Sequence, residues 1–259
     1  MASVRDELWV CHLGLVGYRE ALELQQRICA ARQAGRVPDA MLLLEHPPVY
    51  TRGRRSGPGE LPMGEEWYRA RGIEVCDTDR GGKVTYHGPG QLVGYPIVRV
   101  EDVVGYVRTL ERALIAALAE EGVDARARSD EGPDYTGVWV GERKIASIGI
   151  HVARGVTTHG FAVNVDNDLE PFSWIVPCGL QGVRMTSLAV ELAGLPSDAQ
   201  RVGASSGPGQ PAGPRLRCFR KRAAYHVAEA LGRRQRLISR ARLEQAAAAR
   251  EPALAGASA

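Results

Sequence analysis

The apolar positions of the chain follow two spacings, and the spacing changes at glycines and prolines. Continuous or alternating apolar runs of strand length predict β-strands at residues 8–13, 41–44, 73–77, 92–98, 137–140, 144–152 and 158–165. Apolar residues three or four positions apart predict helices at residues 18–34, 65–71, 103–121, 185–195 and 216–231. The run at 41–44 has no polar face, which predicts a strand buried on both sides. Together these elements predict a mixed α/β (α+β) fold.

Two segments follow neither spacing. Residues 197–214 are rich in glycine, proline and serine, which predicts a flexible insert. After Gly232 the chain is rich in alanine and arginine and has few side chains that could enter a core, so we expect residues 233–259 to be disordered. The predicted domain therefore spans residues 1–232 and contains the insert.

The composition narrows the class of protein. The chain has 259 residues, of which 44% are hydrophobic and 24% charged, as is typical of a globular protein. Its first residues include acids and resemble neither a secretion signal nor a transit segment, and no apolar run approaches the ~20 residues of a membrane span. The five cysteines are odd in number and form no C-x-x-C pair, which disfavours a disulfide framework and a zinc ribbon. We therefore expect a cytoplasmic protein that does not bind membranes.

The net charge of +3 conceals a basic segment. Residues 215–242 contain ten lysines and arginines against one acid, Glu229, so the remainder of the chain is acidic. Such a segment could attract an acidic partner, or it could be a solvated face. The arginines of the tail after Gly232 have no interleaved aromatic residues, which argues against nucleic-acid binding.

Cys178 is the first candidate for chemistry. It follows an apolar run and lies between Pro177 and Gly179, a setting typical of the end of an element. It could equally be a small buried hydrophobic residue, as most free cysteines are. A nucleophilic cysteine reacts as the thiolate, so it needs a neighbour that lowers the pKa of its thiol. Lys144, at the beginning of an apolar strand, is the candidate partner, although it could be an ordinary solvated lysine; His87 and His159 are rival bases.

The stretch from Arg80 to Gln91 is a glycine-rich loop that lets backbone approach a ligand closely. It matches neither of the two common phosphate-binding glycine patterns, so it gives weak support for a nucleotide site. His87, His151, His159 and Cys178 show no recognised metal-ligand spacing. We therefore predict neither a metal nor a cofactor.

Several motifs, in unbroken order from about Leu8 to Leu195, resemble those of the lipoyl(octanoyl) transferase family. They are Leu43–Thr51 followed by Gly53-Arg54, then Arg80–Pro96, Gly137–Val140, Lys144–Gly149, Thr158–Val165, Asp168-Leu169, Phe172, Pro177-Cys178-Gly179 and Thr186-Ser187-Leu188. The glycine-rich and Pro-Cys-Gly motifs are together highly specific. Val163 stands where many members have leucine, and the insert and the residues after Gly232 lie outside the shared pattern.

The resemblance implies one domain like that of lipoate and biotin protein ligases, with a mixed β-sheet flanked by helices and a smaller second sheet. It implies transfer of an octanoyl group from octanoyl-acyl carrier protein to a lysine of a lipoyl domain, as in the E2 subunits of 2-oxoacid dehydrogenases and the H protein of glycine cleavage. Cys178 would carry the octanoyl thioester, and Lys144 would lower its pKa and shuttle protons. The residues implied to bind substrate are Arg80, Gly81, Gly82, Lys83, Val84, Thr85, Tyr86, His87, Ser147, Ile148, Gly149, Gly160, Phe161 and Ala162.

Two alternatives remain open. An ATP-dependent ligase of the lipoate type would share the fold but would not need a nucleophilic cysteine. A non-catalytic relative that binds acyl groups or lipoyl domains would keep the pocket and lack the pair of Cys178 and Lys144, both of which this chain contains.

Overall fold

A mixed sheet forms the centre of the molecule. The computed structural model describes residues 6–176, 182–194 and 214–249. Among these residues the large sheet has nine strands. In spatial order they are β12 (Arg234–Leu237), β1 (Glu7–Leu15), β2 (Asp39–Glu45), β6 (Gln91–Ile97), β10 (Val156–Asn164), β9 (Arg143–Ala153), β8 (Gly137–Val140) and β7 (Arg126–Ala127), with β11 (Arg184–Met185) paired to β9. Strands β12, β1 and β2 run parallel, the pairs from β2 to β7 are antiparallel, and β11 runs parallel to β9.

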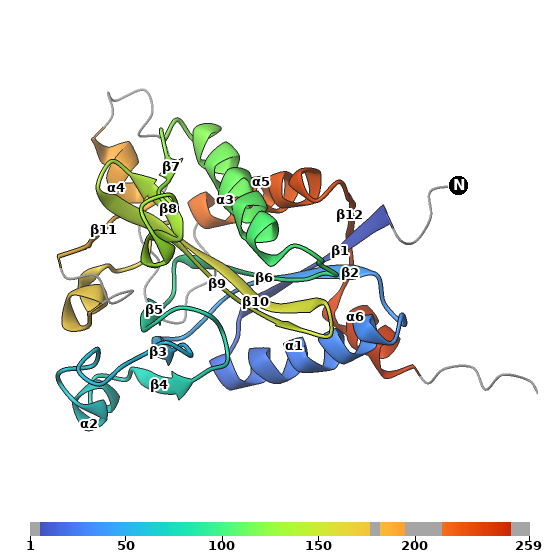
Figure 1. The fold of residues 1–259 in the computed structure, drawn as a ribbon, viewed down its shortest axis with the longest axis horizontal. Helices are drawn as coiled ribbons and strands as arrows, with labels where there is room; N and C mark the ends of the chain where they lie inside the picture. The colour runs from blue at the N-terminus through green and yellow to red at the C-terminus, as the bar shows by residue number, and fades with distance from the viewer. Residues whose placement is uncertain (1–5, 177–181, 195–213, 250–259) are drawn as a thin grey trace, which may run out of the picture.

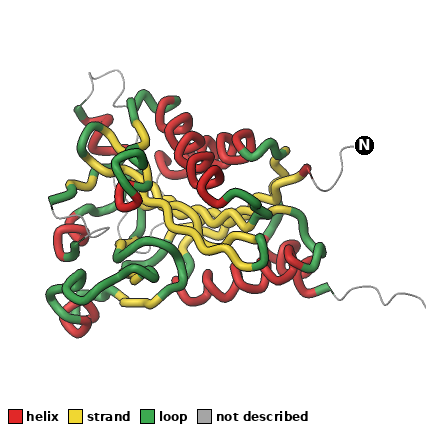
Figure 2. Tube along the Cα trace, in the orientation of Figure 1, coloured by secondary structure: helices red, strands yellow, loops and turns green. Residues whose placement is uncertain are grey.

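Helices cover both faces of this sheet, as Figures 1 and 2 show. Helices α3 (Val103–Ala119) and α5 (Pro214–Ala230) lie on one face, and α1 (Tyr18–Gln33) and α6 (Arg240–Ala248) lie on the other. Strand β2 is buried along its whole length: Met41 and Leu43 enter the core beneath α3 and α5, whereas Leu42 and Leu44 enter the core beneath α1. The predicted fold class and the prediction for residues 41–44 are therefore confirmed.

A smaller sheet lies beside the large one and holds the glycine-rich loop. Its strands are β4 (Glu74–Asp77), β3 (Val49–Arg52) and β5 (Thr85–His87), in that order. Tyrosines from this sheet pack with α2 (Glu65–Arg69) and the 3-10 helix η3 (Glu170–Trp174) in an aromatic core. The Tyr50 hydroxyl donates to the Pro171 carbonyl at 2.7 Å, and the Tyr68 hydroxyl donates to the Trp174 carbonyl at 2.8 Å. These contacts fix the chain just before residues 177–181.

The short helix α4 (Leu188–Ala193) lies within the helix predicted at residues 185–195 but begins three residues later, because Arg184–Met185 form β11. Ser187 is its N-cap, and the Ser187 hydroxyl accepts a hydrogen bond from the Val190 N–H. Ahead of this helix, β11 pairs Met185 with Lys144, and the Thr186 N–H donates to the Lys144 carbonyl at 3.0 Å. The chain that follows residues 177–181 is therefore tied to the strand that carries Lys144.

Residues 233–249 correct the prediction of disorder made for residues 233–259; residues 250–259 lie outside the described residues. Residues Arg234–Leu237 form β12 on the edge of β1, and α6 packs against α1 and β1 with Leu243 fully buried. Few apolar side chains suffice because β1 supplies the backbone hydrogen bonds and acids elsewhere in the chain pair with the arginines. Arg233 lies 3.0 Å from Asp39, Arg234 2.9 Å from Glu7, and Arg240 2.8 Å from Glu20.

The ordered domain therefore does not end at Gly232 but continues through α6. Residues 197–213 of the predicted insert lie outside the described residues, and Pro214 already belongs to α5. Within the described part of the chain, no helix is both long and apolar enough to cross a bilayer.

Candidate active site

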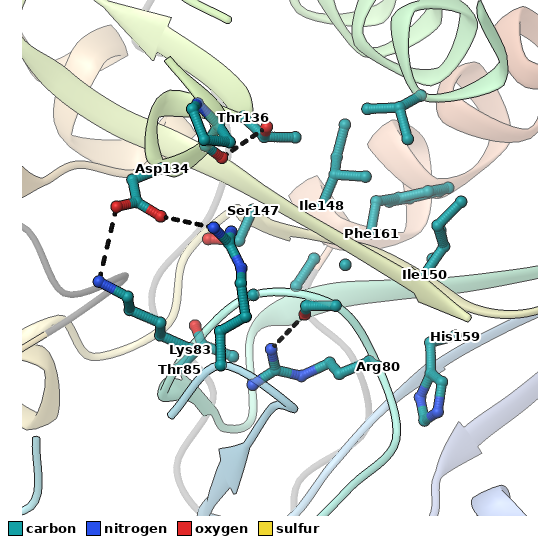
Figure 3. Close-up of a pocket in the computed structure, with 18 of the residues that line it drawn as sticks. Arg80, Lys83, Thr85, Asp134, Thr136, Ser147, Ile148, Ile150, His159 and Phe161 are labelled. Atoms are coloured by element: carbon teal, nitrogen blue, oxygen red, sulfur yellow. Dashed lines mark hydrogen bonds and ion pairs between the residues drawn. The ribbon is translucent and has the colours of Figure 1, made fainter. Parts of the chain in front are cut away.

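A cavity of about 510 Å³ opens between the glycine-rich loop, the hairpin of β9 and β10, the first turns of α3 and the loop at residues 129–136. This volume is within the range of about 300–1,000 Å³ found for small-molecule sites. One wall is apolar and includes Ile148, Ile150 and Phe161, whereas Lys83, Arg80 and Asp134 lie on the other side (Figure 3). A ligand with an apolar end and a charged end would fit this division.

Most of the predicted site residues line this one cavity. They are Lys144 together with Arg80, Gly81, Gly82, Lys83, Thr85, His87, Ser147, Ile148, Gly149, Gly160, Phe161 and Ala162. Val84 and Tyr86 do not line it and instead enter the aromatic core of the smaller sheet. Side chains alternate between the two faces of a strand, so Thr85 and His87 reach the cavity while their neighbours point away from it. Cys178 lies outside the described residues.

Lys144 is almost completely buried, with 1% of the residue exposed. Its ammonium lies over the ring of Trp139, 5.2 Å from the centroid. The lysine chain passes Gly137, where a Cβ atom would lie 2.9 Å from Lys144 Cε and 2.3 Å from the Ala146 carbonyl oxygen. Gly137 has φ +132°, a backbone conformation that favours glycine. The path of Lys144 thus depends on Gly137 and Trp139, which the sequence motifs did not assign to the site.

Glu111 and Arg128 hold the elements around Lys144 in place. Glu111, on α3, is buried; it accepts from the Gly137 N–H at 2.9 Å and from the Ser129 hydroxyl at 2.9 Å. The Arg128 guanidinium lies 4.8 Å from the centroid of Trp139, on which Lys144 also rests, and forms an ion pair with Glu142 at 2.7 Å. Sequence reasoning missed both residues because their contacts with Gly137, Trp139 and Glu142 join different elements and follow no helical or strand spacing.

Arg80 braces the glycine-rich loop against the smaller sheet. Its guanidinium donates to the Thr51 hydroxyl at 2.7 Å, to the Thr51 carbonyl at 2.6 Å and to the Gly81 carbonyl at 3.0 Å. A Cβ atom at Gly149 would lie 2.8 Å from the Gly81 carbonyl oxygen, so the loop rests directly on β9. Arg80 therefore sets the shape of the polar wall.

The two candidate histidine bases are held by hydrogen bonds. His87 Nδ1 lies 2.7 Å from Gln91 Oε1, and burial together with the neighbouring His46 holds the pKa of His87 well below its usual value. His159 Nε2 lies 2.7 Å from Asp79 Oδ1. Burial lowers the pKa of His159 although the Asp79 carboxylate opposes the shift. Both imidazoles are neutral near pH 7, and in the described residues no three His, Cys, Asp or Glu side chains form a cluster that could hold a metal.

An ion-pair bridge crosses the mouth of the cavity. Arg55 Nη1 lies 3.1 Å from Asp134 Oδ1, and Lys83 Nζ lies 3.5 Å from Asp134 Oδ2 (Figure 3). Lys83 belongs to the glycine-rich loop, and Asp134 belongs to the 3-10 helix η2 (Pro133–Tyr135) on the opposite side. Both lips of the cavity thus meet at one carboxylate.

Comparisons with known proteins show the family to which the chain is similar. Residues 17–202 match the family described as lipoyl protein ligase A/B catalytic domain. Among curated relatives, an octanoyltransferase of Solibacter usitatus is 51% identical over 172 residues, covering 65% of this chain and 76% of the relative. An octanoyltransferase of Mycobacterium avium is 50% identical over 199 residues, covering 73% of this chain and 80% of the relative.

Solved structures show a likeness of fold. A protein of T. acidophilum, described as a putative lipoate protein ligase with bound lipoic acid, has a TM-score of 0.68 at 19% identity, covering 93% of both chains. A lipoate-protein ligase A bound with ATP has the same TM-score and identity, covering 93% of this chain and 92% of the other. At this identity the likeness concerns the fold alone.

Proposed function

The chain belongs to the lipoyl protein ligase A/B catalytic domain family, and from this premise we propose that it is an octanoyltransferase of protein lipoylation. The donor is octanoyl-acyl carrier protein, and the acceptor is the ε-amine of a lysine on a lipoyl domain. Such domains occur in the E2 subunits of 2-oxoacid dehydrogenases and in the H protein of glycine cleavage. Relatives named octanoyltransferase at about half sequence identity support this activity.

The observation that carries the proposal is the position of Lys144. This lysine is buried at the wall of the cavity, and the strand that carries it pairs with the chain following residues 177–181. The chain preceding those residues is tied to Glu60, whose carbonyl accepts from the Val176 N–H at 3.1 Å. Both flanks of the segment containing Cys178 are therefore held. This arrangement supports a role for Lys144 beside Cys178.

The reaction proceeds in two acyl transfers. The Cys178 thiolate attacks the carbonyl carbon of the donor thioester, the bond from that carbon to the carrier sulfur breaks, and the departing sulfur takes a proton from Lys144. The acceptor amine then attacks the Cys178 thioester, the bond to Cys178 Sγ breaks, and the amine loses a proton to Lys144. Because a thioester is already activated relative to an amide, neither step needs ATP.

The apolar wall accounts for the acyl group. Ile148, Ile150 and Phe161 face the cavity from β9 and β10, and Val104 and Val107 face it from α3. Each buried methylene of an acyl chain contributes about 0.8 kcal/mol to binding. An octanoyl chain can therefore supply much of its own binding free energy along this wall.

The test is to incubate the full-length protein with octanoyl-acyl carrier protein and to measure its intact mass. We expect one added octanoyl group that peptide mapping places on Cys178, that disappears in Cys178→Ser, and that passes to a lipoyl domain without ATP and in the presence of EDTA. Cys218→Ser is the matched control, because Cys218 is an exposed cysteine that the mechanism does not use, and this variant is expected to retain the adduct.

Two outcomes would contradict the proposal. An adduct on Cys218 or Cys76 would remove Cys178 from the mechanism. A strict requirement for ATP with free octanoate as substrate would favour the ligase alternative instead.

A further inference from the structure

The charges that line the cavity are strongly unbalanced. Among the described residues, five of the six ionised side chains of the lining are cationic, and the one anion is Asp134. A cavity with this excess of positive charge favours an anionic ligand, because low-dielectric walls concentrate its field. An octanoyl chain carries no charge, so the excess of positive charge must bind an anionic group in another part of the substrate.

Three of the five cations are engaged within the protein. Arg80 donates to Thr51 and Gly81, as described above. Arg108 lies 3.1 Å from the buried Glu111 and donates to the Ser129 carbonyl at 3.2 Å. Lys144 is buried against Trp139. The two cations that remain, Arg55 and Lys83, lie at the mouth.

Arg55 and Lys83 share one carboxylate as their ion-pair partner. In the described part of the chain, Asp134 is the ion-pair partner of both, and it brings one negative charge to two positive ones. Arg55 Nη1 is close enough to Asp134 Oδ1 for an ion pair. The two groups are not oriented for a hydrogen bond, and Asp134 Oδ1 accepts none from the described residues. Half of the Arg55 side chain is exposed, and ion pairs at such sites contribute little stability. A ligand anion that carries more negative charge than one carboxylate can therefore displace Asp134 from these two cations.

Backbone hydrogen bonds hold the two cations on one lip. The Arg55 N–H donates to the Gly82 carbonyl at 3.0 Å, and the neighbouring Arg54 N–H donates to the Arg80 carbonyl at 3.0 Å. Arg55 and Lys83 therefore present their charges from one connected unit. Asp134 approaches Lys83 from the opposite lip (Figure 3). A ligand that passes between the lips therefore comes close to both cations.

We propose that Arg55 and Lys83 bind the phosphate of the arm that carries the acyl thioester, and that Asp134 occupies these two cations until the phosphate displaces it. The assignment rests on the proposed function, which supplies a donor whose acyl group hangs on a phosphorylated arm. A phosphate offers several charged acceptor oxygens to a guanidinium and an ammonium, more than the carboxylate it replaces. The mouth thus recognises the donor by its phosphate and releases Asp134 as the donor enters.

The test compares two donors that differ only in the phosphate, octanoyl-4′-phosphopantetheine and octanoyl-pantetheine, with the full-length protein and a lipoyl domain as acceptor. We expect wild type to show a higher kcat/KM with the phosphorylated donor. In the double variant Arg55→Met/Lys83→Met this preference is expected to fall at least about five-fold, because KM rises more for the phosphorylated donor than for the unphosphorylated one. Asp134→Asn is expected to lower KM for the phosphorylated donor, because its two cations are then free.

Arg54→Met is the matched control. Arg54 is exposed and adjacent to Arg55 but does not line the cavity, so its variant is expected to keep the preference of wild type. An unchanged preference in the double variant would overturn the proposal, as would an equal loss with both donors or a rise in KM for Asp134→Asn.

Binding of the unacylated arm separates this proposal from the proposed function. Calorimetry with 4′-phosphopantetheine and pantetheine needs no turnover. We expect wild type to bind the phosphorylated compound more tightly and the double variant to lose this difference. If the protein transfers no octanoyl group but still shows the difference, the proposed function is wrong and the phosphate site stands; if both compounds bind equally to wild type, the site is wrong.

Discussion

At Gly137 a hydrogen atom occupies the place where any other residue would put a carbon. That carbon would meet the Ala146 carbonyl oxygen at 2.3 Å and Lys144 Cε at 2.9 Å. Both are closer than real Cβ contacts, and the carbonyl belongs to the neighbouring strand and cannot rotate away. A single missing side chain therefore keeps open the path by which Lys144 reaches the cavity wall.

We predict that Gly137→Ala lowers both stability and turnover. Overpacking and the positive φ should together reduce the free energy of unfolding by about 3 kcal/mol. Displacing Lys144 by even part of an ångström should reduce kcat about 10- to 100-fold. Urea unfolding and single-turnover acyl transfer on the folded protein measure the two effects separately.

Gly132→Ala is the control for backbone strain in the unfolding measurement. Gly132 has φ +131°, nearly that of Gly137, but a Cβ atom there would meet nothing within 4 Å. Its variant should lose only about 1–2 kcal/mol of stability. Equal losses in the two variants would show that the contacts at Gly137 are unimportant.

At the scale of elements, β12 and α6 show how a segment poor in apolar residues becomes ordered. Strand β12 needs only backbone groups to pair with the edge of β1. Helix α6 then contributes one fully buried side chain, Leu243, to the core beneath α1, and Ser239 caps its first turn through the Arg242 N–H. One buried leucine and one cap suffice to order this helix, because α1 and β1 already form the surface against which it packs.

We predict that Leu243→Ala destabilises the protein by about 2–5 kcal/mol, as expected for a fully buried leucine. Leu237→Ala is the matched control in the same segment, because Leu237 is 69% exposed, and it should change stability by no more than about 0.5 kcal/mol. Urea unfolding curves measure both. Equal, negligible effects would mean that α6 does not pack as described and that the domain ends near Gly232 after all.

At the scale of the whole molecule, several histidines are enclosed in the neutral form. His46 is fully buried; its Nδ1 lies 2.6 Å from the Val16 carbonyl oxygen, and its Nε2 lies 2.7 Å from the Tyr95 hydroxyl. Burial lowers the pKa of His46 to about 4. The ring of His87 is 5.7 Å away, and its pKa is also held low. Protonating either imidazole would place a charge in the interior between the two sheets.

The free energy of unfolding should therefore decrease as the pH falls. A histidine titrates near pH 6.5 in the unfolded chain, so the unfolded state takes up protons first and the stabilisation is lost between pH 6.5 and about 4. The shift of His46 alone corresponds to about 3 kcal/mol over that interval. We predict that the urea midpoint declines from pH 7 to pH 4.5 and that His46→Asn shows a shallower decline. A midpoint independent of pH would contradict this account.

Local chemistry predicted most of the elements and much of the site. Apolar spacing is a property of neighbouring residues, so it predicted that the strand at residues 41–44 is buried on both faces and that helices lie at α1, α3 and α5. The glycine-rich loop and the strand of Lys144 were recognisable as motifs for the same reason. In an extended chain, side chains point alternately to opposite faces. Applied to residues 84–87, this rule could have shown that Val84 and Tyr86 point away from the cavity.

The sequence by itself determined which segments become strands and helices and which residue types stand ready for chemistry. Only the tertiary structure decided which of them meet. Arg55 and Asp134 are 79 residues apart along the chain, and Leu243 of α6 packs with residues of β1 and α1 near the other end of the sequence. No local pattern specifies such contacts. The order of residues 234–248 likewise depends on the edge of β1 and on acids near the N-terminus. The groups that make these contacts are far apart along the chain and meet only when it has folded, so their interaction free energy cannot be inferred from either local sequence.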